Sequence, residues 1–513
     1  MAVAVLSRVL HVYLVLLLLL VGAHSVSAQT PSANVAAEKW IITKIANGKE
    51  AHLIEAFPNA EERRLSASFI QKLLTNSVKG LKVGTRGVHI YDAVVSDPID
   101  LRNEEIPFPF SLSNFIFESD VVLRNASIRG DMDFSKSQFK KVADFEDIKL
   151  ESDAFFPEVT FASGVTFLGA HVRAFDCMGC QFTATDKEAL FESMQIDMNA
   201  FFHKEVEFKG PANFRTMYVG QTIYFGEDVI FDDSVSFLNA EIKKDFMAIG
   251  VHFKNKAQDP NFFGLKVHGN AVFNNSVFDG GLDLRKADID GNLEFENVRA
   301  GNTERAKTLS GLKADGILFD GAQFAPPYWL NAMSYRMISY NMDDEALLSF
   351  VGKSEYKPDV YSTLESFYQR SGDVYAARDV YVAWKNRERD AAFSKFPLRG
   401  IWMWVQYVTT GYGKFLVRAL YWALLFIFVG WAVFRKESGM ETQDEKDAAK
   451  YKGRYHPVWY SLATFLPIVK LPDASIWTPR EDRKLARFYL RLHIIFGYLL
   501  IPIGLAAWTG IIK

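Results

Sequence analysis

The amino-acid sequence predicts a mainly β fold, a right-handed parallel β-helix with helical caps and a C-terminal two-span α-helical membrane region. Three features of the 513-residue chain lead to this prediction. A ladder of apolar residues, spaced five or six positions apart, runs through more than 200 residues. Within it, similar short segments recur at an interval of 22 residues, and two long apolar runs lie near the C-terminus.

The ladder is built mainly from phenylalanine, of which the chain has 43. A strand alternates every second residue and a helix about every 3.6, so neither element alone produces such steps over this length. A chain that turns a corner at each step does produce them. The clearest steps are the pairs Val159/Phe161, Val165/Phe167, Val206/Phe208, Ala212/Phe214, Ile223/Phe225, Val229/Phe231 and Val235/Phe237.

The interval of 22 residues indicates the size of one coil. Gly269–Phe273 and Gly291–Phe295 are offset by 22, Gly280–Leu284 lies halfway between them, and Gly130–Phe134 has the same form. Steps of five and six make four short sides, each with two side chains inward and one outward. We expect glycine, asparagine or aspartate at the corners, where positive φ is often required, and about ten coils with rungs ~4.8 Å apart. A β-sandwich is the alternative, but its turns come about every 8 to 12 residues.

The start of the ladder resembles a known family. Gly87–Val95 (GVHIYDAVV), Ile99–Leu101 (IDL) and Phe108–Leu112 (FPFSL) are similar to the first coils of exported bacterial pentapeptide-repeat-like membrane proteins. The five-residue repeat is degenerate here, with many six-residue steps and phenylalanine in place of the usual leucine. The resemblance covers most of the mature chain and implies its fold and location. The family has no established activity that the resemblance could imply.

The N-terminus has the pattern of a secretory signal. Arg8 precedes the apolar run Val12–Gly22, and the small residues of Ala23–Ala28 follow. We expect a signal peptide at 1–28, cleaved after Ala28, with an uncleaved anchor helix as the alternative. In either case the residues that follow leave the cytoplasm.

Near the C-terminus the apolar runs predict membrane spans at about 415–435 and 492–512, each close to the ~20 residues that a bilayer requires. The loop at 436–490 is rich in lysine and arginine, whereas only Lys513 follows the second span. The positive-inside tendency therefore places this loop in the cytoplasm and the body outside. Before the first span, the tryptophan-rich segment 400–410 is expected to lie at the membrane interface.

Both ends of a solenoid need caps, because an open rung is an unpaired strand edge. Before the coils, Asn59–Glu62 is the expected start of an amphipathic helix. After them, Gly372 ends one expected helix and Asp373 begins another, a pair similar to one tetratricopeptide-type hairpin that we interpret as a cap or spacer. The domain division is thus a signal peptide at 1–28, an N-terminal helical cap at 29–85, the β-solenoid at 86–325, the helical hairpin at 326–394 and a membrane region at 395–513.

Cys177 and Cys180 are the only cysteines, and they lie in the exported body. In an oxidising compartment a structural disulfide is expected, since Gly179 permits a tight turn between them. Buried free thiols are one alternative. A redox or metal role is another, because C-x-x-C is also the spacing of thiol oxidoreductases. However, no helical pattern follows Cys180 and no second pair completes a zinc site.

The apolar segment 457–469 is the other candidate site. With Ser461, Thr464 and Pro467 between two spans, it has the plan of a pore module, but no glycine-rich filter follows it. An interfacial helix on the cytoplasmic side is the simpler interpretation. Gly-Tyr-Gly at 411–413 is similar to a potassium-channel filter, yet it precedes the first span, and we interpret it as a break between helices.

The sequence contains no complete catalytic constellation and indicates no metal or cofactor site. The net charge of −3 predicts no field for nucleic acid. We therefore expect a non-catalytic scaffold or binding protein, anchored in the bacterial cytoplasmic (inner) membrane, whose partners are the lipid bilayer and a protein on the solenoid surface. The alternatives are an oligomeric channel that uses 457–469 and a thiol-disulfide oxidoreductase that uses Cys177 and Cys180.

Overall fold

The computed structural model describes residues 33–341, 343–442, 451, 453–466 and 476–508. The predicted signal peptide lies outside this part of the chain. The chain forms two compact units. Unit 1 extends to Leu347 and includes Lys353–Glu355, and unit 2 comprises Leu348–Gly352 and the residues from Tyr356 onward.

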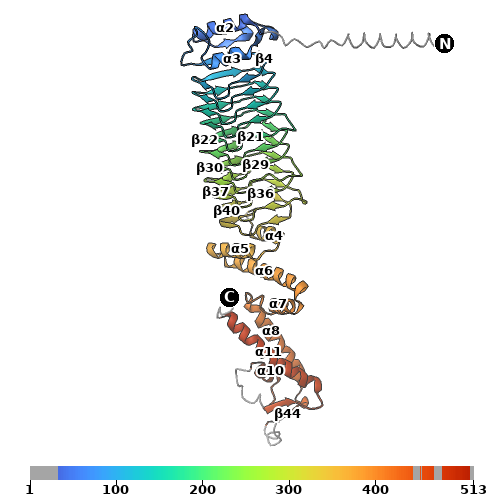
Figure 1. The fold of residues 1–513 in the computed structure, drawn as a ribbon. Coiled ribbons are helices and arrows are strands. Elements are labelled where there is room, and N and C mark those ends of the chain that lie inside the picture. Colours follow the sequence, from blue (N-terminus) through green and yellow to red (C-terminus); the bar gives the residue numbers. More distant parts are fainter. Residues whose placement is uncertain (1–32, 342, 443–450, 452, 467–475, 509–513) are drawn as a thin grey trace, which may run out of the picture. The chain divides into compact units, whose positions relative to one another are not determined.

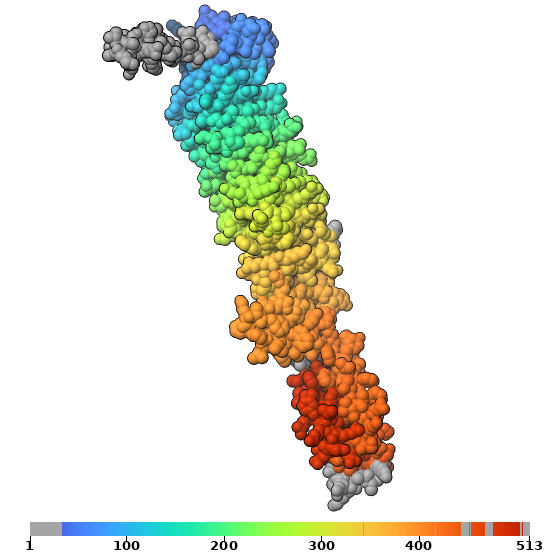
Figure 2. Space-filling model, turned by 90° about the vertical axis from the view of Figure 1, so that its right-hand side faces the viewer, coloured from blue at the N-terminus to red at the C-terminus, as the bar shows by residue number. Residues whose placement is uncertain are grey.

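Unit 1 is a parallel β-solenoid of about 11 turns, which confirms the predicted fold (Figure 1). Each coil has four short sides, and each strand pairs in parallel with the strand of the next coil, as in Gln138↔Thr160 and Phe139↔Phe161. Successive coils follow one another in chain order, from cyan to yellow in Figure 2.

Sides 1 and 4 of the coils belong to one sheet of 21 strands. The strands of side 1 are β3 (Val88–Tyr91), β7 (Phe110–Ser113), β11 (Met132–Asp133), β15 (Asp153–Phe155), β19 (Ala174–Asp176), β23 (Ala200–Phe202), β27 (Ile223–Phe225), β31 (Phe246–Ala248) and β34 (Ala271–Val272). The strands of side 4 are β6 (Glu105–Ile106), β10 (Ser127–Ile128), β14 (Lys149–Leu150), β18 (His171–Val172), β22 (Gln195–Ile196), β26 (Tyr218–Val219), β30 (Glu241–Ile242) and β33 (Lys266–Val267). Three longer strands serve both sides, namely β37 (Asp288–Glu294), β40 (Lys313–Leu318) and β43 (Ser334–Ser339).

Sides 2 and 3 form separate sheets. Side 2 consists of β4 (Val94–Val95), β8 (Ile116–Phe117), β12 (Gln138–Phe139), β16 (Thr160–Phe161), β20 (Gln181–Phe182), β24 (Glu207–Phe208), β28 (Ile230–Phe231), β32 (His252–Phe253), β35 (Val277–Phe278), β38 (Arg299–Ala300) and β41 (Gln323–Phe324). Side 3 consists of β5 (Ile99–Asp100), β9 (Val121–Val122), β13 (Ala143–Asp144), β17 (Val165–Thr166), β21 (Ala189–Leu190), β25 (Ala212–Asn213), β29 (Val235–Ser236), β36 (Leu282–Asp283), β39 (Lys307–Thr308) and β42 (Tyr328–Trp329).

The phenylalanines of the ladder form stacked columns inside the coils. On side 2, the ring of Phe208 lies 4.3 Å from that of Phe182 and 4.8 Å from that of Phe231. On side 3, Phe214 stacks in the same way, and all four of these side chains are fully buried or nearly so. Burial of such large apolar side chains is the main source of stability in a fold whose strands are mostly only two or three residues long.

Residues with positive φ recur at two of the four corners, between sides 1 and 2 and between sides 3 and 4. Asn114 (φ 57°) and Asn125 (φ 58°) are examples, and asparagine tolerates this conformation better than most residues. Their side-chain amides also link coils, because Asn114 Nδ2 donates to Asp92 Oδ1 at 2.7 Å and Asn125 Nδ2 to Asn103 Oδ1 at 3.2 Å. These corners are therefore ladders of asparagine and aspartate more than of glycine.

The prediction of positive φ at the repeated glycines is wrong for three of the four. Gly130 has φ 102°, but Gly269, Gly280 and Gly291 are not in the left-handed region. They lie where two coils approach closely. A Cβ on Gly291 would lie 2.5 Å from Oδ1 of Asn270 and 2.6 Å from the carbonyl oxygen of Gly269. These glycines serve close backbone approach, not a special dihedral angle.

An N-terminal cap covers the first coil (Figure 1). It contains α2 (Val35–Ala46), the 3₁₀ turns η1 (Leu53–Glu55) and η2 (Ala60–Arg63), and α3 (Ala67–Leu74). Its strands β1 (Ala51–His52) and β2 (Arg64–Leu65) pair with β3 and β4 and so occupy the open edge. The helix that we expected from Asn59 begins only at Ala67. Between these two residues, Arg64 and Leu65 form β2, which pairs with β4 of the first coil.

In its described residues, unit 2 is helical except for one small two-stranded sheet. Its elements are α4 (Asp344–Gly352, begun in unit 1), α5 (Pro358–Ser371), α6 (Val374–Lys395), α7 (Pro397–Thr410), α8 (Leu416–Phe434), η3 (Glu437–Gly439), β44 (Met440–Thr442), α10 (Pro457–Phe465), β45 (Trp477–Pro479) and α11 (Lys484–Trp508). As expected, Gly372 ends α5 with φ 83°, and the side chain of Asp373 caps α6 by accepting from the backbone N–H of Ala376.

Two helices of unit 2 are long and apolar enough to cross a membrane. They are Val417–Phe434, with mean hydropathy 1.9, and Lys484–Pro502, with mean hydropathy 1.3. Only 17% and 22% of the residues in these two segments are buried, and the others are partly or fully exposed. The second helix begins at Lys484, earlier than the predicted start at 492, and the predicted span continues beyond the described residues.

Candidate functional site

One outward-facing column of the solenoid carries four large, mainly apolar side chains and one aspartate. The outward residues of the side-1 strands stand in register from coil to coil, in the order Phe155, Asp176, Phe201, Tyr224 and Met247. We call Phe155, Phe201, Tyr224 and Met247 the outer ridge, which Asp176 interrupts between its first two members. Phe201 is 36% exposed and the other three are partly exposed, whereas the chain neighbours of each are buried. The outer ridge is therefore a largely apolar strip on the solvent-exposed surface.

The outward column of side 4, in the same sheet, shows what this surface otherwise carries. Its side chains are polar or charged over the same coils, with residues Lys149, His171, Gln195, Tyr218, Glu241 and Lys266. Side 2 adds ion pairs between coils, for example Lys209 Nζ with Oδ2 of Asp232 at 3.0 Å. Hydrogen bonds from this lysine to Glu207 and Asp232 raise its pKa above the ordinary value. These charged side chains form a solvent-exposed face, and their ion pairs link successive coils.

Aromatic contacts join the outer ridge across coils. The ring of His203 lies 6.3 Å from that of Phe201 and 6.2 Å from that of Tyr224. Met198, 39% exposed, precedes the strand of Phe201, and its sulfur accepts a hydrogen bond from Nε2 of Gln221 at 3.1 Å. Exposed Phe, Tyr and Met side chains in one strip are the composition typical of protein interfaces.

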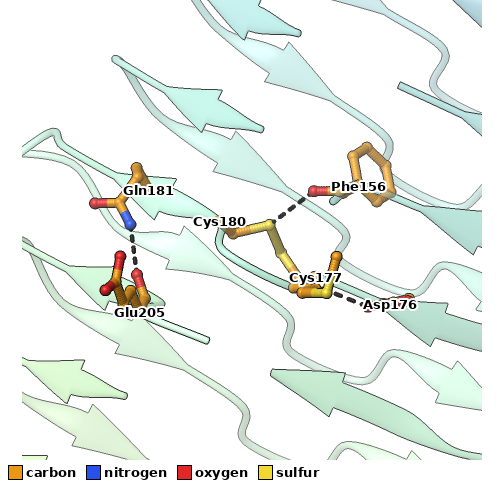
Figure 3. The surroundings of a disulfide bond; sticks show 7 residues. Phe156, Asp176, Cys177, Cys180, Gln181 and Glu205 are labelled. Atoms are coloured by element: carbon orange, nitrogen blue, oxygen red, sulfur yellow. Dashed lines mark hydrogen bonds between the residues drawn. A yellow bond between two sulfur atoms is a disulfide. The ribbon is translucent and has the colours of Figure 1, made fainter. Parts of the chain in front are cut away.

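The predicted cysteine site is a disulfide in the solenoid wall (Figure 3). Cys177 and Cys180 have Cα atoms 5.4 Å apart, and Gly179 between them has φ 68°. Both cysteines have no exposed surface, and Sγ of Cys180 lies 3.1 Å from the carbonyl oxygen of Phe156 in the preceding coil. Thiol exchange requires an accessible sulfur, so this geometry favours a structural role over a redox one.

The candidate membrane segment places its two described polar residues against backbone. Ser461 is fully buried, and its hydroxyl donates to the carbonyl oxygen of Ile427 in α8 at 2.8 Å. The hydroxyl of Thr464 donates within its own helix, to the carbonyl oxygen of Tyr460 at 2.8 Å. Pro467 lies outside the described residues. Ser461 therefore attaches α10 to α8, whereas the hydroxyl of Thr464 bonds within α10.

The structure brings His493 into this cluster, which the sequence did not predict. The sequence places it near the start of a span, where polar side chains usually reach the membrane surface, but its exposure is 0%. Nε2 lies 2.9 Å from the carbonyl oxygen of Ser461, and Nδ1 lies 3.4 Å from the hydroxyl of Tyr489, which donates to Phe426. We assign Nε2–H as the donor to Ser461. The spacing of Tyr489 and His493, four residues apart in an apolar helix, is the signal that could have shown them to be neighbours.

Several acidic residues of the coils pair with basic side chains. Asp283 pairs with Arg285 at 2.7 Å, and His268 pairs with Asp290 at 2.8 Å. Within the described part of the chain, no three His, Cys, Asp or Glu side chains gather in a way that could hold a metal ion.

Comparison with known proteins gives no relative: no family model, no curated protein and no solved structure matches this chain.

Proposed function

We propose that this chain is a membrane-anchored binding protein that presents its solenoid outside the bacterial cytoplasmic membrane, in the manner of an exported pentapeptide-repeat-like protein. The outer ridge binds a protein partner through an apolar, partly aromatic surface. The single observation that carries this proposal is the column of Phe201, Tyr224 and Met247, whose outward side chains are partly exposed and largely apolar over three successive coils, with Phe155 in the same column beyond Asp176.

Membrane anchoring is supported by the surface of α8 and α11. Leu420, Leu424 and Phe428 of α8 are 57%, 53% and 62% exposed, and Ile495 and Tyr498 of α11 are 51% and 60% exposed. Exposing this much apolar surface to water is unfavourable, by about 25 cal/mol per Å². A lipid environment removes that cost.

The orientation rests on charge and on the signal pattern. The lysine- and arginine-rich loop at 436–490 is held in the cytoplasm, and the residues after Ala28 are exported. A reporter enzyme that is active only in the cytoplasm is expected to be active when fused within this loop. If the reporter is active only when it is fused after the signal sequence, the orientation is opposite to the proposed one.

Site-specific photocrosslinking in intact cells tests the ridge. Benzoylphenylalanine replaces Phe201, and the control places it at Gln195, the outward residue of side 4 in the neighbouring strand of the same sheet. The expected result is a discrete adduct from position 201 that is absent from position 195. The adduct should also disappear when Tyr224→Glu is added, because a charge on the adjacent ridge residue opposes an apolar partner. Equal adducts from both positions, or none from position 201, would refute the proposed surface.

A further inference from the structure

Unit 2 has a cavity of about 520 Å³, open to the surface, that is lined by α6, α7 and α11. A second cavity, of about 370 Å³, lies beside α5, α6 and α7. Both volumes fall in the range of about 300 to 1,000 Å³ typical of ligand sites. Three charged residues line both cavities, namely Lys385, Glu388 and Arg399. The two cavities therefore meet at these side chains.

The charged group has an excess of positive charge. Oε2 of Glu388 lies 2.8 Å from Nζ of Lys385, and its Oε1 lies 2.6 Å from Nη2 of Arg399. One carboxylate thus faces two cations, and Lys395 adds a third cation to the wall of the smaller cavity. An anion is the ligand that this charge complements.

The smaller cavity also contains a buried donor that is only weakly satisfied. The indole Nε1–H of Trp384 interacts with the hydroxyl of Tyr356, but no acceptor within the described part of the chain meets it in full hydrogen-bonding geometry. A buried donor without an acceptor costs free energy unless a ligand or water supplies one. Lys385, Arg399 and Trp384 together offer hydrogen-bond donors where the two cavities meet. A phosphate group is an acceptor that requires such donors.

Apart from the shared charges and the polar side chains of Gln406, Thr409 and Thr410, the lining of the larger cavity is mostly apolar or aromatic. Trp402 and Met403 of α7 line one part of it, and Phe496, Leu499 and Leu500 of α11 line another. Leu499 is 51% exposed on a helix that is apolar enough to cross a membrane. Inorganic phosphate would fill only the polar part and would leave the apolar volume empty. An acyl chain fits that volume.

We infer that the two cavities form one binding site for an anionic phospholipid, with the phosphate at Lys385, Arg399 and Trp384 and an acyl chain along Trp402, Met403 and the α11 residues. This site rests on the proposed membrane anchoring, because the lipid enters from the bilayer. It makes the junction of α6 and α7 with the membrane helices dependent on lipid, independently of what the outer ridge binds.

Lipid retention by the full-length protein tests the site. The protein is extracted in mild detergent, and its bound phospholipid is measured by native mass spectrometry before and after addition of phosphatidylglycerol or phosphatidylcholine. We expect about one phosphatidylglycerol per chain, bound more tightly than phosphatidylcholine and not displaced by millimolar inorganic phosphate. Displacement by inorganic phosphate would show a free-anion site instead and would overturn the inference.

Two variants and a control locate the lipid. Lys385→Gln with Arg399→Gln should weaken retention, by about tenfold for each charge-assisted hydrogen bond that is removed. Val405→Trp, which fills the apolar cavity and keeps the charges, should weaken it as well. The control is Arg378→Gln, also on α6 and paired with Asp379 at 3.0 Å but outside both cavities. If the wild type and these three variants retain equal amounts of phosphatidylglycerol, the proposed lipid site is wrong.

Membrane extraction of the same variants separates this inference from the anchoring proposal. All four proteins should stay in the carbonate-resistant membrane fraction if α8 and α11 span the bilayer. Loss of the wild-type chain from that fraction would refute the anchoring itself. A membrane-resident chain that retains no phosphatidylglycerol would refute the lipid site alone.

Discussion

Phe175 and Cys177 reverse the order of small and large inward residues found in the side-1 strand of the preceding coil. There the first inward position holds Ala154 and the second holds Phe156, and the register pairs Ala154 with Phe175. In both coils the two inward positions are thus filled by one large and one small residue. The exchange leaves a small residue next to the corner, where Cys177 reaches Cys180.

The disulfide is expected to add modest stability. Its sequence separation is three residues, and closing so short a loop stabilises the folded state by about 2 kcal/mol on the chain-entropy model. Cys177→Ala with Cys180→Ala should lower the thermal unfolding midpoint without loss of the β-sheet signal in circular dichroism. The triple variant Phe175→Ala, Cys177→Phe and Cys180→Val restores the small-then-large order of the preceding coil and should recover part of the lost stability. A triple variant that is less stable than the double variant would contradict the idea that the two inward positions can exchange their residues.

Core and surface phenylalanines should respond very differently to truncation. Phe214 is fully buried between Phe191 and Phe237, with ring centroids 4.8 and 4.7 Å away. Phe214→Ala should lower the unfolding free energy by about 3 to 5 kcal/mol. Phe201→Ala, on the outer ridge, removes the same ring from a site that is 36% exposed and should cost clearly less. Denaturant unfolding followed by circular dichroism measures both, and equal losses would mean that the ridge is part of the core.

The ladder made the solenoid predictable. Two inward residues and one outward residue on each side produce apolar steps of five or six residues, which neither a long strand nor a helix produces. Its details were less accessible. The register advances by 22 residues from Gln138 to Thr160 but by 26 from Gln181 to Glu207, since extra residues bulge at a corner. Such insertions hide the repeat without changing the stack. The role of Gly291 was also hidden, because close approach depends on the neighbouring coil and not on the local sequence.

The candidate sites were predictable only where the residues are neighbours in sequence. Cys177 and Cys180 are three positions apart, so their pairing follows from local geometry. Ser461 and His493 are 32 positions apart and meet only because α8, α10 and α11 pack together. The outer ridge needed the register of the coils, since one outward residue in each coil carries no signal until the coils are aligned.

Gly430 is expected to be indispensable for the packing of the candidate membrane helices. A Cβ at this position would lie 2.2 Å from Oγ of Ser461 and 2.8 Å from Cε1 of His493. Gly430→Ala should therefore separate α8 from α10 and lower the thermal midpoint of the detergent-solubilised protein. The matched control is Gly352→Ala at the end of α4, where an added Cβ meets nothing within 4 Å. A similar midpoint for the two variants would contradict the close packing.

Lys307 is expected to make the stability of the solenoid depend on pH. It occupies an inward position of side 3, in register between Leu282 and Tyr328, and its side chain has no exposed surface. Its ammonium group donates to the carbonyl oxygens of Asn302 and Arg305. Burial lowers the pKa of Lys307 from 10.5 to about 8, although the charge of Asp259 opposes part of this effect.

The sign of the dependence follows from proton binding. Between pH 8 and pH 10.5 the unfolded chain keeps a proton on Lys307 that the folded chain has released, so the unfolding free energy rises with pH across this window. Below pH 8 the lysine is charged in both states and its burial penalty is largest. Lys307→Met should therefore stabilise the protein most near pH 7, and its advantage over the wild type should shrink toward pH 10. The control is Lys313→Met, at an outward side chain that is 64% exposed. Thermal unfolding at pH 7, 8, 9 and 10 measures the three proteins, and an advantage of Lys307→Met that does not change with pH would show that the pKa of Lys307 is the same in the folded and unfolded chains, which contradicts the prediction.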